Sequence, residues 1–99
     1  MFYVCKCPLQ YDPYGHVGFR RCSDKKTVIL VCDECEAVWL TPAEVEKPNP
    51  WLVKPPLYLL PGTEIRVFGE DTAWATMGEI RGSGWEDFIT GECKALGEH

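Results

Sequence analysis

The six cysteines in this chain of 99 residues constrain its fold more than any other feature. Two of them, Cys32 and Cys35, are separated by two residues and lie between two apolar runs in the stretch VILVCDECEAVWLTPAEV. A chain this short buries too little apolar surface for a wide margin of stability. Thiols that share a metal ion or a disulfide would therefore contribute a large part of the folding free energy.

The N-terminal stretch, MFYVCKCPLQ, indicates which of these two roles the thiols have. It contains no long apolar run, so it is not typical of a secretory signal peptide. No part of the chain approaches the ~18 consecutive apolar residues of a membrane-spanning helix. We therefore expect a cytoplasmic protein that does not contact a membrane. In a reducing compartment, closely spaced thiols bind metal more often than they form disulfides.

Short β-prone segments follow one another in the N-terminal part of the chain and predict a small sheet. They are Phe2–Cys5, Val17–Cys22, Thr27–Cys32 and Ala37–Leu40. The polar residues Ser23–Lys26 between the second and third segments suit a four-residue hairpin loop.

This hairpin determines which cysteines can meet. With the loop at these positions, Val17 pairs with Cys32 and Cys22 pairs with Thr27. Cys22 then lies about 16 Å from Cys32 along the strand, outside any site at that end. The same register brings His16 beside Cys32.

Four cysteines are the expected ligands of a zinc ion. Cys32 and Cys35 share a tight turn that points both sulfurs at one ion. Cys5 and Cys7 are separated by one residue, and residues i and i+2 of a strand lie on the same face. Because structural zinc is tetrahedral, these two pairs complete a site, with His16 as the alternative fourth ligand.

Two other uses of Cys32 and Cys35 fit the sequence less well. A thioredoxin-like redox disulfide lies where a helix follows a strand, whereas the residues after Cys35 are β-branched and aromatic. An iron site of the rubredoxin type needs two C-x-x-C pairs, and one of them is missing. Cys22 and Cys93 are expected to be ordinary buried or exposed thiols.

Residues 1–41 resemble a zinc ribbon, in which two cysteine-bearing turns hold one zinc ion in front of a three-stranded sheet. The sequence CDEC at residues 32–35 matches the second of these turns. The first turn departs from the family's C-x-x-C spacing, because CPLQ at residues 7–10 has glutamine where the second thiol would stand. The resemblance implies that Cys5 or His16 takes its place, or that the metal has been lost.

The remainder of the chain predicts short elements. The sequence TPAE at residues 41–44 starts a brief helix, with threonine as its cap and proline in its first turn. Frequent prolines predict an extended connector over residues 42–56, anchored by Trp51. Beyond it, the sequence predicts a small hairpin and short helices, one of them capped at Thr76.

The expected fold class is therefore mixed β with short helices, a small α+β fold. We expect a single domain over residues 1–99, with a zinc-ribbon-like lobe at 1–41, the connector at 42–56 and an acidic, aromatic-rich lobe at 57–99.

No catalytic motif is visible in the sequence. The only histidines are His16 and His99, and neither belongs to a recognisable nucleophile motif. No phosphate-binding glycine loop is present. Asp33 and Glu34, inside the cysteine turn, are expected to be solvated carboxylates. We therefore predict that the protein is not an enzyme and has no small-molecule substrate.

The charge of the chain indicates the kind of partner. The net charge is −5, and residues 41–99 carry the whole excess, with ten acidic and five basic side chains. A surface of this sign repels phosphate backbones and suits a basic protein. Acidic residues among large aromatic ones are typical of the rim and centre of protein interfaces. The residues expected to bind the partner are Glu64, Glu70, Asp71, Trp74, Glu79, Trp85, Glu86 and Asp87.

Two functions are compatible with these features. The chain is similar in general character to immunity proteins of bacterial polymorphic toxin systems. The shared features are small size, acidity, an expected structural metal site and the lack of catalytic motifs. That likeness implies that it binds and neutralises a cognate basic toxin domain. The alternative is a zinc-ribbon accessory protein that binds nucleic acid or the transcription and translation machinery through basic residues at the hairpin tip. Those residues are Arg20, Arg21, Lys25 and Lys26.

Overall fold

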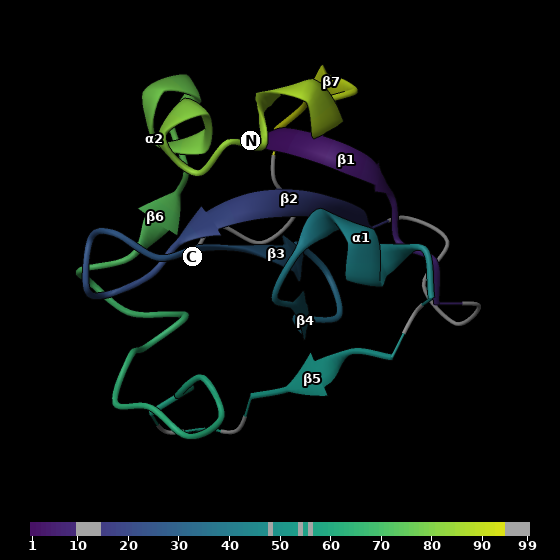
Figure 1. Cartoon of the computed structure of the whole chain (residues 1–99). Helices are drawn as coiled ribbons and strands as arrows, with labels where there is room; N and C mark the ends of the chain where they lie inside the picture. Colours follow the sequence, from purple (N-terminus) through teal and green to yellow (C-terminus); the bar gives the residue numbers. More distant parts are fainter. Residues whose placement is uncertain (10–14, 48, 54, 56, 95–99) are drawn as a thin grey trace.

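The computed structural model describes residues 1–9, 15–47, 49–53, 55 and 57–94. Its centre is an antiparallel sheet with the strand order β5-β4-β3-β2-β1-β7, in which β6 also pairs with β2 (Figure 1). The strands are β1 (Phe2–Lys6), β2 (His16–Arg21), β3 (Val28–Cys32), β4 (Ala37–Trp39), β5 (Trp51–Leu52), β6 (Ala73–Trp74) and β7 (Gly91–Glu92). The helices are α1 (Pro42–Val45), α2 (Met77–Gly82) and the 3-10 helix η1 (Glu86–Phe88). The expected class, a small α+β fold, is confirmed.

The hairpin of β2 and β3 has the register predicted from the sequence. Val17 lies opposite Cys32, and the backbone N–H of Cys22 donates to the carbonyl of Thr27 over 2.9 Å. Cys22 and Cys32 are consequently at opposite ends of the hairpin. This register fixes which side chains face each side of the sheet.

Both faces of the sheet are covered, so β3 is buried along its whole length. The cluster on one face contains Val17, Phe19, Leu30, Cys32, Ala37 and Trp39, together with Val45 of α1 and Ile80 of α2. The cluster on the other face contains Ile29, Val31 and Val38, together with Leu60, Val67 and Phe68. The two sets alternate along each strand because successive side chains of a strand point to opposite faces.

The C-terminal part of the chain belongs to the same sheet as the N-terminal part. Tyr3 of β1 lies opposite Gly91 of β7, and the Met1 ammonium donates to the carbonyl of Cys93 over 2.8 Å. Gly91 lies against the Tyr3 ring, because a Cβ at that position would be 2.5 Å from the Tyr3 hydroxyl oxygen. The two lobes expected from the sequence thus share strands of one sheet.

The expected connector, residues 42–56, contains α1 and β5 among its described residues. The helix begins as predicted, with the Glu44 carboxylate accepting the backbone N–H of Thr41 over 2.9 Å. Trp51 pairs with Val38 of β4, which makes β5 the outer strand of the sheet. The backbone of Trp51 anchors the segment, while its side chain remains 44% exposed.

The predicted second hairpin, over residues 57–68, forms a single antiparallel bridge between Leu59 and Arg66. The backbone N–H of Leu60 donates to the carbonyl of Ile65 over 2.9 Å, next to this bridge. The segment therefore folds back on itself and covers the face of the sheet that carries Val31.

Arg20 lies beneath this covering segment and is 0% exposed. Its Nε donates to the Val67 carbonyl over 3.1 Å and its Nη2 to the Thr72 hydroxyl over 2.7 Å. Its guanidinium lies 5.2 Å from the centre of the Phe68 ring and 4.9 Å from that of Trp74. Burial lowers the pKa of Arg20 to about 10, so the side chain stays charged at neutral pH. The expectation that Arg20 is exposed at the hairpin tip is wrong, because the second half of the chain folds over it.

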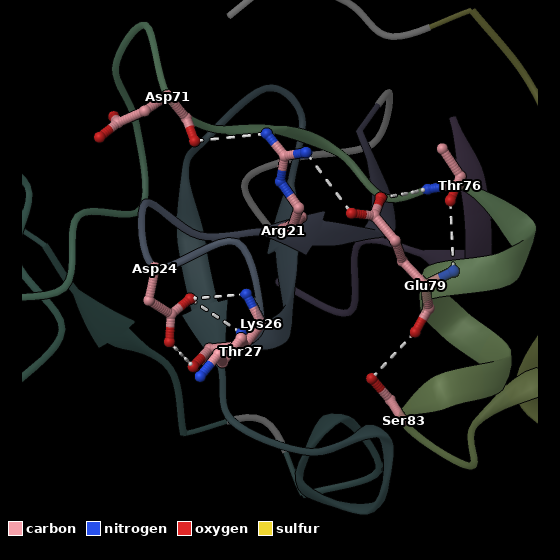
Figure 2. A network of polar contacts seen from close by, with 8 residues as sticks. All are labelled: Arg21, Asp24, Lys26, Thr27, Asp71, Thr76, Glu79 and Ser83. Carbon is pink, nitrogen blue, oxygen red and sulfur yellow. Dashed lines mark hydrogen bonds and ion pairs between the residues drawn. The ribbon is translucent and has the colours of Figure 1, made fainter.

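Asp24 closes the loop of this hairpin (Figure 2). Its carboxylate accepts the backbone N–H groups of Lys26 over 3.0 Å and of Thr27 over 2.9 Å, and also the Thr27 hydroxyl over 2.5 Å. Slight burial raises the pKa of the Asp24 carboxyl, but these hydrogen bonds outweigh it and hold the pKa below its ordinary value. A side chain of this kind supplies the hydrogen bonds that a short loop lacks in its own backbone.

We expect Arg20→Ala to lower the free energy of unfolding by about 3 kcal/mol, because it removes two buried hydrogen bonds and the contacts with two aromatic rings. Urea unfolding followed by tryptophan fluorescence measures the change. Lys26→Ala, in the exposed loop, serves as the control and should change the free energy by less than about 0.5 kcal/mol. Equal effects of the two substitutions would contradict the buried position of Arg20.

We expect Asp24→Ala to lower the free energy of unfolding by about 1 kcal/mol at neutral pH. The pKa of Asp24 is lower in the folded state than in the unfolded state, so its contribution is complete above the unfolded value of ~4. The contribution is lost as the pH falls through the folded-state pKa. Urea unfolding of the wild type and of Asp24→Ala at neutral and acidic pH measures this loss of stability. A difference between them that persists unchanged at acidic pH would show that the Asp24 carboxylate is not responsible.

Candidate metal centre

Three thiols meet at one end of the sheet. The Sγ atoms of Cys7, Cys32 and Cys35 all lie within 4.8 Å of one another, and those of Cys7 and Cys35 are 3.8 Å apart. Cys32 is buried, whereas Cys7 and Cys35 are partly exposed. These three sulfurs are close enough to share one metal ion.

The turn between β3 and β4 positions two of the three thiols. Cys32 is the last residue of β3, and its sulfur accepts the backbone N–H of Cys35 over 3.5 Å. The turn closes where the N–H of Glu36 donates to the Cys32 carbonyl over 3.1 Å, with Glu36 in the left-handed region at φ 62°. A backbone N–H that points at a ligand sulfur stabilises its negative charge when the thiol ionises.

Cys7 reaches this turn because it lies just beyond the end of β1. Its backbone N–H donates to the carbonyl of Gly15 over 2.8 Å, directly before β2 begins. The site therefore joins the chain after β1 to the turn between β3 and β4, two segments that do not pair in the sheet.

Cys5, the fourth ligand expected from the sequence, lies outside this group. Cys5 is opposite Val17, and Val17 is opposite Cys32. The three residues thus form a row across three strands, which separates the Cα atoms of Cys5 and Cys32 by roughly 10 Å. Cys5 and Cys7 do pack against the same hydrophobic cluster, as their spacing predicted, but Val17 stands between Cys5 and the turn.

His16, the alternative ligand, also lies outside the group. It precedes Val17 in β2, so its side chain points to the face opposite that of Cys32. The centre of its ring is 4.7 Å from that of Tyr3. The register brings the backbone of His16 beside the cysteine turn, as expected, but not its imidazole.

Asp33 holds the cysteine turn against β2. Its carboxylate accepts the backbone N–H of His16 over 2.8 Å, and its own N–H donates to the His16 carbonyl over 3.1 Å. Because β2 begins directly beside the turn, Asp33 is only 2% exposed. The expectation of a solvated carboxylate is wrong for Asp33, whereas Glu34 is exposed.

The remaining thiols lie away from the site. Cys22 is buried in the cluster on the opposite face, and burial raises its pKa to about 12. Cys93 follows β7, and its backbone N–H donates to the carbonyl of Met1 over 2.9 Å. Both positions agree with the roles expected from the sequence.

The Cys7 thiol is harder to ionise than a free cysteine. Burial, together with the charge of the neighbouring Cys32, raises the pKa of the Cys7 thiol to about 12. A metal ion binds the thiolate form, so binding releases protons and weakens as the pH falls. Three thiolates are a soft donor set that suits Zn²⁺ and other thiophilic ions.

Several of the acidic residues expected to bind a partner are engaged within the chain. Glu79 caps α2 by accepting the backbone N–H of Thr76 over 2.9 Å and forms a 3.5 Å ion pair with Arg21 (Figure 2). Ion pairs also join Asp71 to Arg66 and Glu86 to Arg81. Glu64, Glu70 and Asp87 are exposed.

The two tryptophans of the predicted partner surface are partly buried. Trp74 packs against the guanidinium of Arg20, and the ring centre of Trp85 is 6.4 Å from that of Phe19 in the core. Their indole rings therefore contribute to folding.

A different surface combines exposed apolar side chains with acidic residues. Leu40, Trp51 and Leu52 are 37%, 44% and 67% exposed, and all three lie on or beside β4 and β5. A hollow of about 640 Å³ lies beside Trp51, between α1 and β5. It is lined by Ala43, Glu44, Glu46, Lys47, Asn49, Pro50 and Trp51. This surface was not predicted from the sequence, although Trp51 and Leu52 follow a proline in the expected connector.

Part of the chain is similar to a viral protein. The chain is 36% identical to an uncharacterised protein of Acanthamoeba polyphaga mimivirus over 66 residues, which are 63% of this chain and 53% of that protein. The matched region thus spans about half the length of the curated relative. No family model and no solved structure matches the chain. Among the described residues, no helix has the length and apolar composition needed to cross a membrane.

Metal analysis of purified variants tests the candidate site. We expect about one zinc ion per chain in the wild type and in Cys5→Ser, and almost none in Cys32→Ser, because structural zinc depends on each of its thiolate ligands. Inductively coupled plasma mass spectrometry measures the content. Cys93→Ser, which changes another partly exposed thiol, is the control and should retain the zinc. Full zinc content in Cys32→Ser would mean that the metal lies elsewhere.

Proposed function

We propose that this protein is a non-catalytic module that is stabilised by a structural zinc ion and binds a basic protein partner. The observation that carries the proposal is the group of Cys7, Cys32 and Cys35, whose sulfurs lie within 4.8 Å of one another. Zinc bound there would join the end of β1 to the turn between β3 and β4. In a domain this small, such a bond supplies stability that the hydrophobic core alone does not. This arrangement supports the zinc-ribbon resemblance of residues 1–41, with a modified first turn.

The surroundings of the thiols favour a structural metal over a catalytic one. A catalytic zinc site needs a base beside the metal-bound water. Asp33, the buried carboxylate in the turn, is bonded to the backbone of His16. The His16 ring packs against Tyr3 on the other face of the sheet. Neither side chain is therefore available as a base at the metal.

The surface beside β5 is the best candidate for the site that binds the partner. It combines the exposed indole of Trp51 with Glu44 and Glu46, which line the same hollow. An aromatic residue in a shallow hollow with charged neighbours is typical of residues that dominate binding energy in protein interfaces. The net charge of −5 favours a basic partner. A toxin domain neutralised by an immunity protein has this character, and we propose it as the class of partner.

The nucleic-acid alternative loses support from the position of its basic residues. Arg20 is fully buried, and Arg21 is paired with Glu79. Among the basic residues expected at the hairpin tip, Lys25 and Lys26 remain exposed. Two lysines neutralise too few phosphates for tight binding at physiological salt.

The partner surface can be tested with a matched pair of aromatic substitutions. Trp51 and Phe88 are 44% and 43% exposed, but Phe88 lies on η1, away from β5. We expect Trp51→Ala to weaken binding to a basic protein partner by about 30-fold or more, the effect of removing a central interface residue. Phe88→Ala should leave the affinity within about twofold, since it lies outside the proposed interface. Isothermal titration calorimetry at low and moderate salt measures both effects.

Salt dependence provides a further check on the same complex. Attraction between an acidic surface and a basic partner is screened by salt, so the affinity should fall as the salt concentration rises. A larger loss of affinity for Phe88→Ala than for Trp51→Ala would place the interface elsewhere. Retention of the protein on heparin at moderate salt would support nucleic-acid binding instead.

A further inference from the structure

Two of the three clustered thiols are accessible from solvent and close to each other. Cys7 and Cys35 are partly exposed, and their sulfurs are 3.8 Å apart. Cys32 is 0% exposed and lies within the hydrophobic cluster under the sheet. A small oxidant arriving from solvent therefore meets Cys7 and Cys35 before it meets Cys32.

The distance between these sulfurs is short enough for a covalent bond after small side-chain movements. A disulfide has an S–S distance of about 2.05 Å. Rotation of the two cysteine side chains can bring their sulfurs from 3.8 Å apart to this distance. Cys7 lies beyond the end of β1 and Cys35 lies in a turn. Neither residue lies within a strand; the Cys7 N–H bonds to the Gly15 carbonyl and the Cys35 N–H to the Cys32 sulfur.

We propose that Cys7 and Cys35 form a site of oxidative modification, at which a peroxide joins the two thiols into a disulfide. One thiol loses its proton, and its thiolate attacks hydrogen peroxide to give a sulfenic acid and, after protonation of the leaving hydroxide, water. The second thiol then attacks the sulfenic sulfur, which forms the S–S bond and releases a second water. The two thiols together lose two protons and two electrons, which reduce the peroxide to two molecules of water.

The disulfide would connect the same two segments as the proposed metal ion. It would consume two of the three candidate ligands, Cys7 and Cys35, and leave Cys32 alone. Oxidation and metal binding at this site therefore exclude each other. The inference shares its residues with the proposed function but depends only on the geometry of the thiols, so each can fail without the other.

Disulfide mapping after oxidation tests the proposal directly. The purified protein, with its metal content measured beforehand, is treated with hydrogen peroxide, alkylated and digested without reduction. We expect a loss of two hydrogens in the intact mass and one dominant cross-linked pair of peptides, containing Cys7 and Cys35. Cys7→Ser should abolish this product, and Cys93→Ser should leave its yield unchanged. Any metal present should be released in step with the cross-link.

The same reaction in denaturant is the control for folding. There the pairing among the six cysteines should become mixed, because the native arrangement is lost. A dominant Cys32–Cys35 link in the native protein would overturn the proposal. Conversion to sulfinic acid without a cross-link, or an equal preference for Cys7–Cys35 in denaturant, would overturn it as well.

Discussion

The pairing of β2 with β3 is the interaction on which the rest of this structure depends. It places Val17 opposite Cys32 and so brings the cysteine turn to the beginning of β2, where Asp33 bonds to the backbone of His16. The same register puts Arg20 on the opposite face, where it holds the segment after β5 against the sheet. A slip by one residue would exchange the two faces and separate both groups of contacts.

The cluster of three thiols and Arg20 lie on opposite faces of this hairpin, and they would stabilise it in different ways. Arg20 is fixed by hydrogen bonds and ring contacts that the chain supplies by itself. The thiols of Cys7, Cys32 and Cys35 have their full effect only when they share an ion or a covalent bond. The chain thus supplies a permanent internal link on one face, whereas the proposed link on the other face would depend on metal or on oxidation.

Local patterns in the sequence predicted the parts of the fold that depend on neighbouring residues. The loop closed by Asp24, the caps at Thr41 and Thr76, and the C-x-x-C turn all involve contacts within a few positions, and their chemistry is specific. The position of Cys22 away from the site followed from counting along a strand, and the structure agrees with it.

The features that the sequence did not reveal depend on contacts between distant segments. Cys5 shares a face with Cys7, but the strand that carries Val17 lies between Cys5 and the turn. The pairing of β7 with β1 and the burial of Arg20 both require the C-terminal half to fold back over the sheet. No periodicity within a single segment contains that information.

We propose that three sulfurs, and not four, bind one metal ion at the end of this sheet. X-ray absorption spectroscopy at the zinc edge of the metal-loaded protein counts the sulfur ligands directly. We expect three sulfurs at about 2.3 Å and one oxygen or nitrogen ligand, which completes a tetrahedral shell. A shell of four sulfurs would mean that Cys5 moves past Val17 to join the site. A shell made of oxygen and nitrogen alone would contradict the site itself.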